Sequence, residues 1–192
     1  MGISERSKPG SYPGTTLRSV SWADDLDTVR GFFREYRRWL ADHRGTAASD
    51  VSIATAGLSA IDKQIEELPG VYGPPRGEIL LAFAQEVPVA CGALRELEPK
   101  VGEIKRLYVR EDHRGGEFGR RLTGALIDRA RELGYRRVRA DTLPSMRAAI
   151  QFYQELGFDP IPAYWPHPVP GALFFEYKVE KPKPTHRMRK AS

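Results

Sequence analysis

Glu103-Ile104-Lys105-Arg106-Leu107-Tyr108-Val109 is followed by Arg110-Glu111-Asp112-His113, by Arg114-Gly115-Gly116-Glu117-Phe118-Gly119, and then by a helical run to Leu133. The alternation in the first segment predicts a strand that enters a glycine-rich turn, and the turn opens a helix. Such a turn points several backbone N–H groups and the positive end of a helix dipole at one anion. Its glycines let the backbone come close to a phosphate, because they carry no Cβ. This stretch therefore predicts a site for the phosphates of a cofactor.

The sequence on either side of this stretch predicts a mixed sheet covered by helices. Seven strands are expected, at residues 16–20, 77–84, 88–94, 103–109, 137–141, 158–164 and 172–179. Four helices are expected: one that follows Ser21 or Asp24 and ends near 43–45, then 58–68, 118–133 and 146–156. Three antiparallel strands precede a β-α-β unit in this order. We expect an α+β fold of three α/β/α layers with a mostly antiparallel sheet.

Several boundaries depend on single residues. Pro69-Gly70 is expected to stop the second helix, which follows a loop or an irregular helix at residues 46–56. Arg95 is expected to leave its strand, so that residues 96–102 form a polar hairpin loop. Ser145 is expected to cap the last helix.

Charge is unevenly distributed along the chain, whose net charge is +5. Residues 181–192 contain five basic residues and no acidic residue, whereas the remaining chain contains 25 of each kind. The basic character therefore belongs to this segment and does not favour a nucleic-acid-binding face on the folded domain. We expect a disordered N-terminal segment at 1–15, one domain at 16–179 and a basic disordered tail at 180–192.

The composition excludes several classes of protein. There is no run of about 18 apolar residues, so no transmembrane helix or membrane partner is expected, and residues 1–6 do not read as a signal peptide. The single cysteine, Cys91, excludes an internal disulfide, and we expect it to be a small buried hydrophobic residue in a cytoplasmic protein. The four histidines lack the spacing of metal ligands, so no metal site is expected. His113 is interpreted as a turn residue rather than a catalytic base.

Two well-known phosphate motifs do not fit the turn. In the dinucleotide-binding pattern G-x-G-x-x-G, the first glycine would fall on Arg114, and the P-loop pattern G-x-x-x-x-G-K-[ST] is absent. Three antiparallel strands before the turn also argue against a dinucleotide-binding domain.

Another pair of motifs does fit. The first is the strand, Arg-Gly-x-x-x-Gly turn and long helix of residues 103–122, and the second is Ala149-x-x-Phe152-Tyr153-x-x-x-Gly157-Phe158. In this order and separation they resemble the GNAT family of N-acetyltransferases, and the resemblance covers roughly residues 16–179. It implies the acyl-CoA N-acyltransferase fold, with acetyl-CoA as acetyl donor.

The resemblance also implies how the cofactor is held. The pyrophosphate would lie on the N–H groups of the turn, with added contacts from Arg114 and Arg120, and the pantetheine arm would follow the strand that precedes the turn. The implied cofactor-binding residues are Leu107, Tyr108, Val109, Arg114, Gly115, Gly116, Glu117, Phe118, Gly119 and Arg120. Two positions depart from the family pattern, which usually has glycine in place of Glu117 and often asparagine in place of Met146. The Glu117 carboxylate is expected to turn to solvent.

The same resemblance implies two catalytic residues. Glu103 matches the general base of some family members, and Tyr153 matches the general acid that protonates the CoA sulfur. Their alternatives are a surface acid at a strand end and a helix tyrosine whose ring lies in the core. A backbone N–H near Tyr108 is the expected donor to the oxyanion. Tyr164, Trp165 and His167 are expected either to line the acceptor site or to pack over the end of the sheet.

The first hypothesis is therefore an N-acetyltransferase that acts on a primary amine, of a small molecule or a protein, by direct attack in a ternary complex. A non-catalytic acyl-CoA-binding regulatory module is the alternative, and a nucleic-acid-binding protein acting through the basic tail is a third hypothesis. Dimers are common in the family, and a homodimer is compatible with this sequence.

Overall fold

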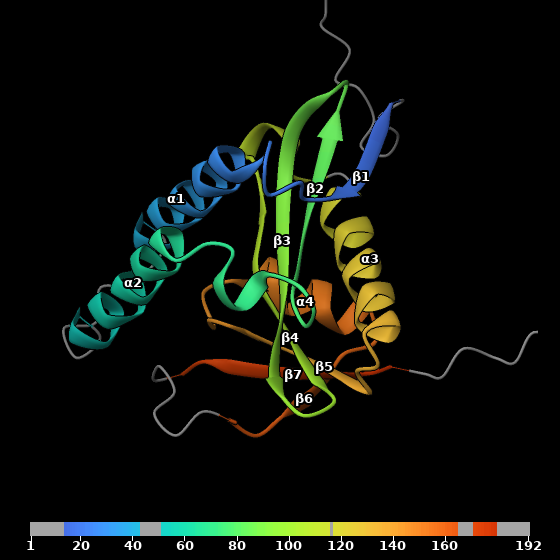
Figure 1. Ribbon diagram of the computed structural model, residues 1–192. Helices are drawn as coiled ribbons and strands as arrows, with labels where there is room; N and C mark the ends of the chain where they lie inside the picture. The colour runs from blue at the N-terminus through green and yellow to red at the C-terminus, as the bar shows by residue number, and fades with distance from the viewer. Residues whose placement is uncertain (1–13, 43–50, 116, 165–170, 180–192) are drawn as a thin grey trace, which may run out of the picture.

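The chain folds into a seven-stranded sheet with helices on both faces (Figure 1). The computed structural model describes residues 14–42, 51–115, 117–164 and 171–179. The helices and strands are, in chain order, β1 Thr15–Ser19, α1 Leu26–Asp42, α2 Val51–Glu66, β2 Glu78–Ala84, β3 Val87–Glu98, β4 Val101–Val109, α3 Phe118–Glu132, β5 Arg137–Thr142, α4 Arg147–Glu155, β6 Asp159–Ile161 and β7 Leu173–Lys178. Two 3-10 turns, η2 Gly70–Tyr72 and η3 Glu111–His113, connect them. This is the predicted order of elements.

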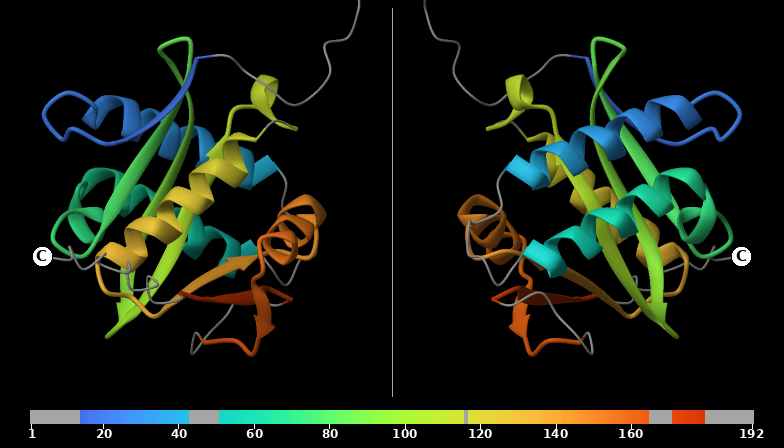
Figure 2. Two further views of the ribbon diagram at one scale, coloured as in Figure 1. Left: turned by 90° about the vertical axis from the view of Figure 1, so that its right-hand side faces the viewer. Right: turned by 90° about the vertical axis from the view of Figure 1, so that its left-hand side faces the viewer.

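The predicted three-layer α/β/α architecture is confirmed. The strands lie in the order β1-β2-β3-β4-β5-β7-β6, and of these neighbouring pairs β4–β5 alone is parallel. Helices α1 and α2 cover one face, and α3 and α4 cover the other (Figure 2). Val29, Phe32 and Phe33 of α1 are buried on the first face, and Leu122 and Leu126 of α3 on the second.

The hairpin between β3 and β4 is longer than predicted. Arg95 does not leave its strand, because β3 continues to Glu98 and β4 already begins at Val101. The polar residues stay in the ladder because they find partners: Arg95 opposes and hydrogen-bonds Glu103 across the ladder, and Glu96 pairs with Arg76 in the segment before β2. The turn itself is tightened by Lys100, whose φ is +66°.

Three further boundaries differ from the prediction. Helix α2 begins at Val51, inside the segment 46–56 for which either a loop or an irregular helix was expected. Ser145 does not cap α4: the cap is Met146, whose side chain makes no capping hydrogen bond. Strand β6 has three residues rather than the seven expected, because Pro160 and Pro162 lack the N–H groups that a longer ladder needs.

A bulge in β4 determines the geometry of the central sheet. Across the β3–β4 ladder, Cys91 opposes Tyr108 and Ala93 opposes Lys105, so that Arg106 and Leu107 together face Gly92. Arg106 has φ +56°, in the left-handed region. Gly92 leaves the space into which Leu107 packs, since an added Cβ would lie 2.9 Å from Leu126 Cδ1 and 3.2 Å from Leu107 Cδ1.

We expect Gly92→Ala to destabilise the fold by about 1–3 kcal/mol, because the added methyl overpacks the contact between the bulge and α3. Gly124→Ala is the matched control: Gly124 lies within α3, and an added Cβ there meets no atom within 4 Å. That variant should gain roughly 0.5–1 kcal/mol from helix propensity. Urea titration measures both values. A Gly92→Ala protein as stable as wild type would show that the bulge does not depend on this close approach.

Candidate functional site

The parallel strands β4 and β5 separate in the middle of the sheet. They pair over three residues, Val101–Glu103 with Arg137–Arg139, although β4 continues to Val109 and β5 to Thr142. The bulge at Arg106 and Leu107 lies just beyond the last pair and bends β4. The edge of β4 that faces β5 is therefore left without a strand partner beyond Glu103, so an extended ligand could pair with it.

The predicted phosphate turn follows the same strand and leads into α3. Arg110 fixes its start, with Nη2 and Nε donating to Glu35 of α1 at 2.8 and 3.1 Å. Gly115 has φ +78°, which a glycine adopts without strain. Glu117 is the N-cap residue of α3; its side chain is exposed and makes no capping bond, in line with the expectation that it turns to solvent. The first N–H groups of α3 are thus available to an anion.

The predicted cofactor residues are brought together along β4 and this turn. Leu107 and Val109 pack toward α3, whereas Tyr108 packs toward α1. The two arginines have partners within the protein: Arg114 lies over the Trp39 and Tyr108 rings and donates to Val109 O, and Arg120 pairs with Glu155 of α4 at 2.8 Å. Phe118 is buried and Gly119 lies near Phe152 of α4. Gly116 lies outside the described residues.

Glu103 is fully buried, so the alternative of a surface acid is wrong. Nε and Nη2 of Arg95 lie 2.7 and 2.6 Å from its Oε2, and the Tyr164 hydroxyl donates to Oε1 at 2.9 Å. The Tyr164 ring also packs edge-on against Phe174 of β7. Tyr164 therefore both contacts the buried Glu103 and packs over the sheet. Trp165 and His167 lie outside the described residues.

An ion pair spans the gap between the separating strands. Lys105 Nζ of β4 lies 2.6 Å from Asp141 Oδ1 of β5 and 3.6 Å from Glu103 Oε1. Burial alone would lower the pKa of Lys105, but the carboxylates of Asp141 and Glu103 outweigh it and raise that pKa. Arg95, Lys105 and Asp141 were not among the predicted site residues. The run of charges at 103, 105 and 106 within an otherwise apolar strand was a signal for Lys105, whereas Arg95 and Asp141 lie on other strands and had no such signal.

Tyr153 of α4 is buried, and its ring stacks on Phe175 with centroids 5.7 Å apart. Its pKa is raised, first by burial and then by the nearby carboxylate of Asp141. The phenol is therefore protonated at neutral pH and is a weaker acid than an ordinary tyrosine. The ring lies in the core, as one interpretation expected.

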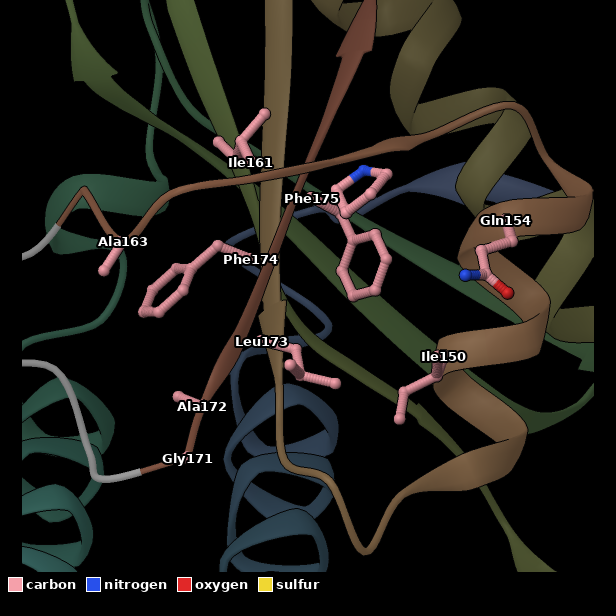
Figure 3. A pocket seen from close by; sticks show the side chains of 10 residues that line it. Ile150, Gln154, Ile161, Ala163, Gly171, Ala172, Leu173, Phe174 and Phe175 are labelled. Carbon is pink, nitrogen blue, oxygen red and sulfur yellow. The ribbon is translucent and has the colours of Figure 1, made fainter.

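A separate apolar pocket of about 400 Å³ lies between α4 and the β6–β7 ribbon. Figure 3 shows Ile150 and Gln154 on α4 facing Leu173 and Phe175 of β7. None of the residues predicted for cofactor binding or catalysis lines it. Cys91, by contrast, is buried in β3 as predicted, and burial raises the pKa of its thiol.

In the part of the chain that the structure describes, no three His, Cys, Asp or Glu side chains gather where they could hold a metal ion. Nor does any helix there have the length and apolar character needed to cross a membrane.

The chain is similar in sequence to proteins of a known family. The model of the Acetyltransferase (GNAT) family matches residues 52–158. An uncharacterized N-acetyltransferase of Schizosaccharomyces pombe is 30% identical over 168 residues, which cover 86% of this chain and 96% of that protein.

Two solved structures share the fold. PaiA N-acetyltransferase from Thermoplasma acidophilum, solved in complex with coenzyme A, has a TM-score of 0.65 and 19% identity, with 86% of this chain and 99% of that chain covered. YncA from Salmonella typhimurium, solved with its cofactor acetyl-CoA, has a TM-score of 0.59 and 18% identity, with coverages of 86% and 94%. At these identities the likeness concerns the fold alone.

We expect Lys105→Met to lower the free energy of unfolding by about 2–3 kcal/mol, because it leaves the carboxylates of Asp141 and Glu103 without their ammonium partner. Lys63→Met is the matched control, since Lys63 is 72% exposed in its pair with Glu67 and should contribute about 0.5 kcal/mol or less.

The pH dependence of this loss follows from the raised pKa of Lys105. The stabilisation is complete below the unfolded pKa of about 10.4 and disappears only as the pH rises through the raised folded value. The difference between wild type and Lys105→Met should therefore stay constant between about pH 6 and 9 in urea titrations. Equal stabilities at pH 7 would contradict the structural role of the ion pair.

Proposed function

Because the chain belongs to the acetyltransferase (GNAT) family, we propose that it transfers the acetyl group of acetyl-CoA to a primary amine. The observation that supports this proposal most strongly is that β4 and β5 separate, and that β4 then leads into the glycine turn at which α3 begins. Acetyl-CoA would supply an activated thioester, whose carbonyl carbon is open to attack by the amine in a ternary complex.

The residues around the gap fit such a cofactor. The unpaired edge of β4 offers N–H and C=O groups to the amides of an extended arm, and the first turn of α3 offers N–H groups to phosphates. The exposed Glu117 carboxylate leaves its backbone N–H available to them. Arg114, which lies over the Trp39 and Tyr108 rings, and Arg120, which pairs with Glu155, would contribute positive charge to the phosphates.

We assign the proton transfers to residues on either side of the gap. The buried Glu103 is the proposed base, and the Tyr164 hydroxyl would connect it to the amine: the tyrosine oxygen accepts the amine proton while its own proton moves to Glu103 Oε1, 2.9 Å away. Tyr153 is the proposed acid toward the leaving thiolate, because its place in the α4 motif matches the general acid of the family, although burial raises its pKa and makes it a weaker donor than an ordinary phenol. A backbone N–H near Tyr108, adjoining the β4 bulge, is the proposed donor to the oxyanion.

The direct test is release of free thiol from acetyl-CoA in the presence of a panel of primary amines. We expect thiol release that depends on both acetyl-CoA and the amine, together with micromolar binding of CoA in titration calorimetry. Tight CoA binding without release for any amine would replace the enzyme by a non-catalytic acyl-CoA-binding module. Absence of CoA binding at millimolar concentration would remove both functions.

Two variants separate the catalytic roles by their pH–rate profiles. Tyr153→Phe should lower kcat about 100-fold with little change in CoA affinity, because it removes the proton donor alone. Glu103→Gln should lower the rate most at low pH, where the amine is hardest to deprotonate, and Tyr164→Phe should share that profile if it carries the proton. Circular dichroism and calorimetry control for folding and CoA binding. Full activity of Tyr153→Phe, or an unchanged profile for Glu103→Gln, would reject the respective role.

A further inference from the structure

The bulge in β4 places two consecutive cations on the same face of the sheet. In a regular strand Lys105 and Arg106 would point to opposite faces. Here Arg106 contacts Gln64 of α2 and Tyr36 of α1, on the face of Lys105 and Glu103, while Leu107 joins the core under α3. A non-glycine residue holds the left-handed conformation at this point, with φ +56°. The backbone thus directs Arg106 toward the α1–α2 side of the gap.

Arg106 differs from the neighbouring cations in its partners. Among the described residues, Glu103 pairs with Arg95 and Asp141 with Lys105, and neither carboxylate forms an ion pair with Arg106. Among the described residues, Arg106 meets neutral groups: Nη2 and Nε donate to Gln64 Oε1 at 2.7 and 3.2 Å, and the guanidinium lies 5.5 Å from the Tyr36 ring centre. The Tyr72 hydroxyl donates to the same Gln64 oxygen at 2.9 Å, which fixes that amide in place.

A partly buried guanidinium that neutral partners hold in position is suited to bind an anion. Its planar donors match a carboxylate, and the interaction is strengthened because no carboxylate of the described residues already neutralises the charge. Arg106 adjoins Leu107 and Tyr108, the strand along which the acetyl donor is proposed to lie. An anion bound here would therefore belong to the acceptor and lie a short distance from its amine.

We propose that the acceptor is a small amine that also carries a carboxylate, an amino acid in the chemical sense, and that Arg106 binds this carboxylate. This inference rests on the proposed acetyl transfer and narrows its acceptor class. Gln64 acts as a positioning residue that holds the guanidinium without neutralising it, and Tyr72 orients Gln64.

The experiment compares amino acids with their carboxamides, which have the same side chain and amine but no carboxylate. Wild type should show a kcat/KM about 10- to 100-fold higher for the amino acid, the ratio expected for one hydrogen-bonded charge. Arg106→Gln should remove this preference by raising KM for the amino acid, with little effect on the carboxamide. Arg34→Gln, at an exposed position of α1, is the control and should retain the preference.

Gln64→Glu separates substrate binding from a structural role of Arg106. A glutamate in this place keeps an acceptor for Arg106 and Tyr72 but neutralises the guanidinium. We expect it to lose the amino-acid preference as Arg106→Gln does while the fold is retained. If Gln64→Glu keeps the preference, Arg106 only braces β4 against α2 and the proposal is wrong.

Titration calorimetry of the same ligand pairs, in the presence of CoA, tests the inference without turnover. Amino-acid binding that exceeds carboxamide binding in wild type and not in Arg106→Gln supports the site, even if no thiol is released and acetyl transfer itself fails. Equal binding and equal kcat/KM of acids and amides in wild type would overturn the acceptor class and leave the proposed acetyl transfer intact.

Discussion

The structure depends on the separation of two parallel strands within an otherwise continuous sheet. β4 and β5 are hydrogen-bonded as far as Glu103, and beyond it the bulge at Arg106 turns β4 away. The gap is spanned by the ion pair between Lys105 and Asp141 rather than by backbone bonds. The opening leaves one strand edge unpaired, gathers charged side chains on the α1–α2 face, and directs β4 into the turn that begins α3. The separation of β4 from β5 therefore creates both the proposed donor site and the proposed acceptor site.

Much of this arrangement could be predicted from the sequence because it depends on local patterns. The order of strands and helices follows from hydrophobic periodicity and from glycine and proline positions, and the glycine turn between β4 and α3 identified the candidate phosphate site. The apolar strand around Cys91 predicted its burial correctly. The family resemblance implied the cofactor and the candidate catalytic residues Glu103 and Tyr153.

The remainder depends on contacts between distant segments, which periodicity does not encode. The sequence predicts that Arg95 begins a loop. In the structure Arg95 pairs with Glu103 across the ladder, so the polar residues that follow it belong to the strand. The left-handed conformation of Arg106 has no local signal, because glycine is the residue that usually marks such a position. The pairing of Lys105 with Asp141, 36 residues away, appears only when β5 lies beside β4.

Amide hydrogen exchange with and without acetyl-CoA measures directly whether the gap between β4 and β5 holds the acetyl donor. Acetyl-CoA should slow exchange in the second half of β4 and in the first turn of α3, while exchange in β1 and β2 stays unchanged. Protection confined to the pocket between α4 and β7, or exchange in β4 and α3 that does not respond to acetyl-CoA, would contradict this placement.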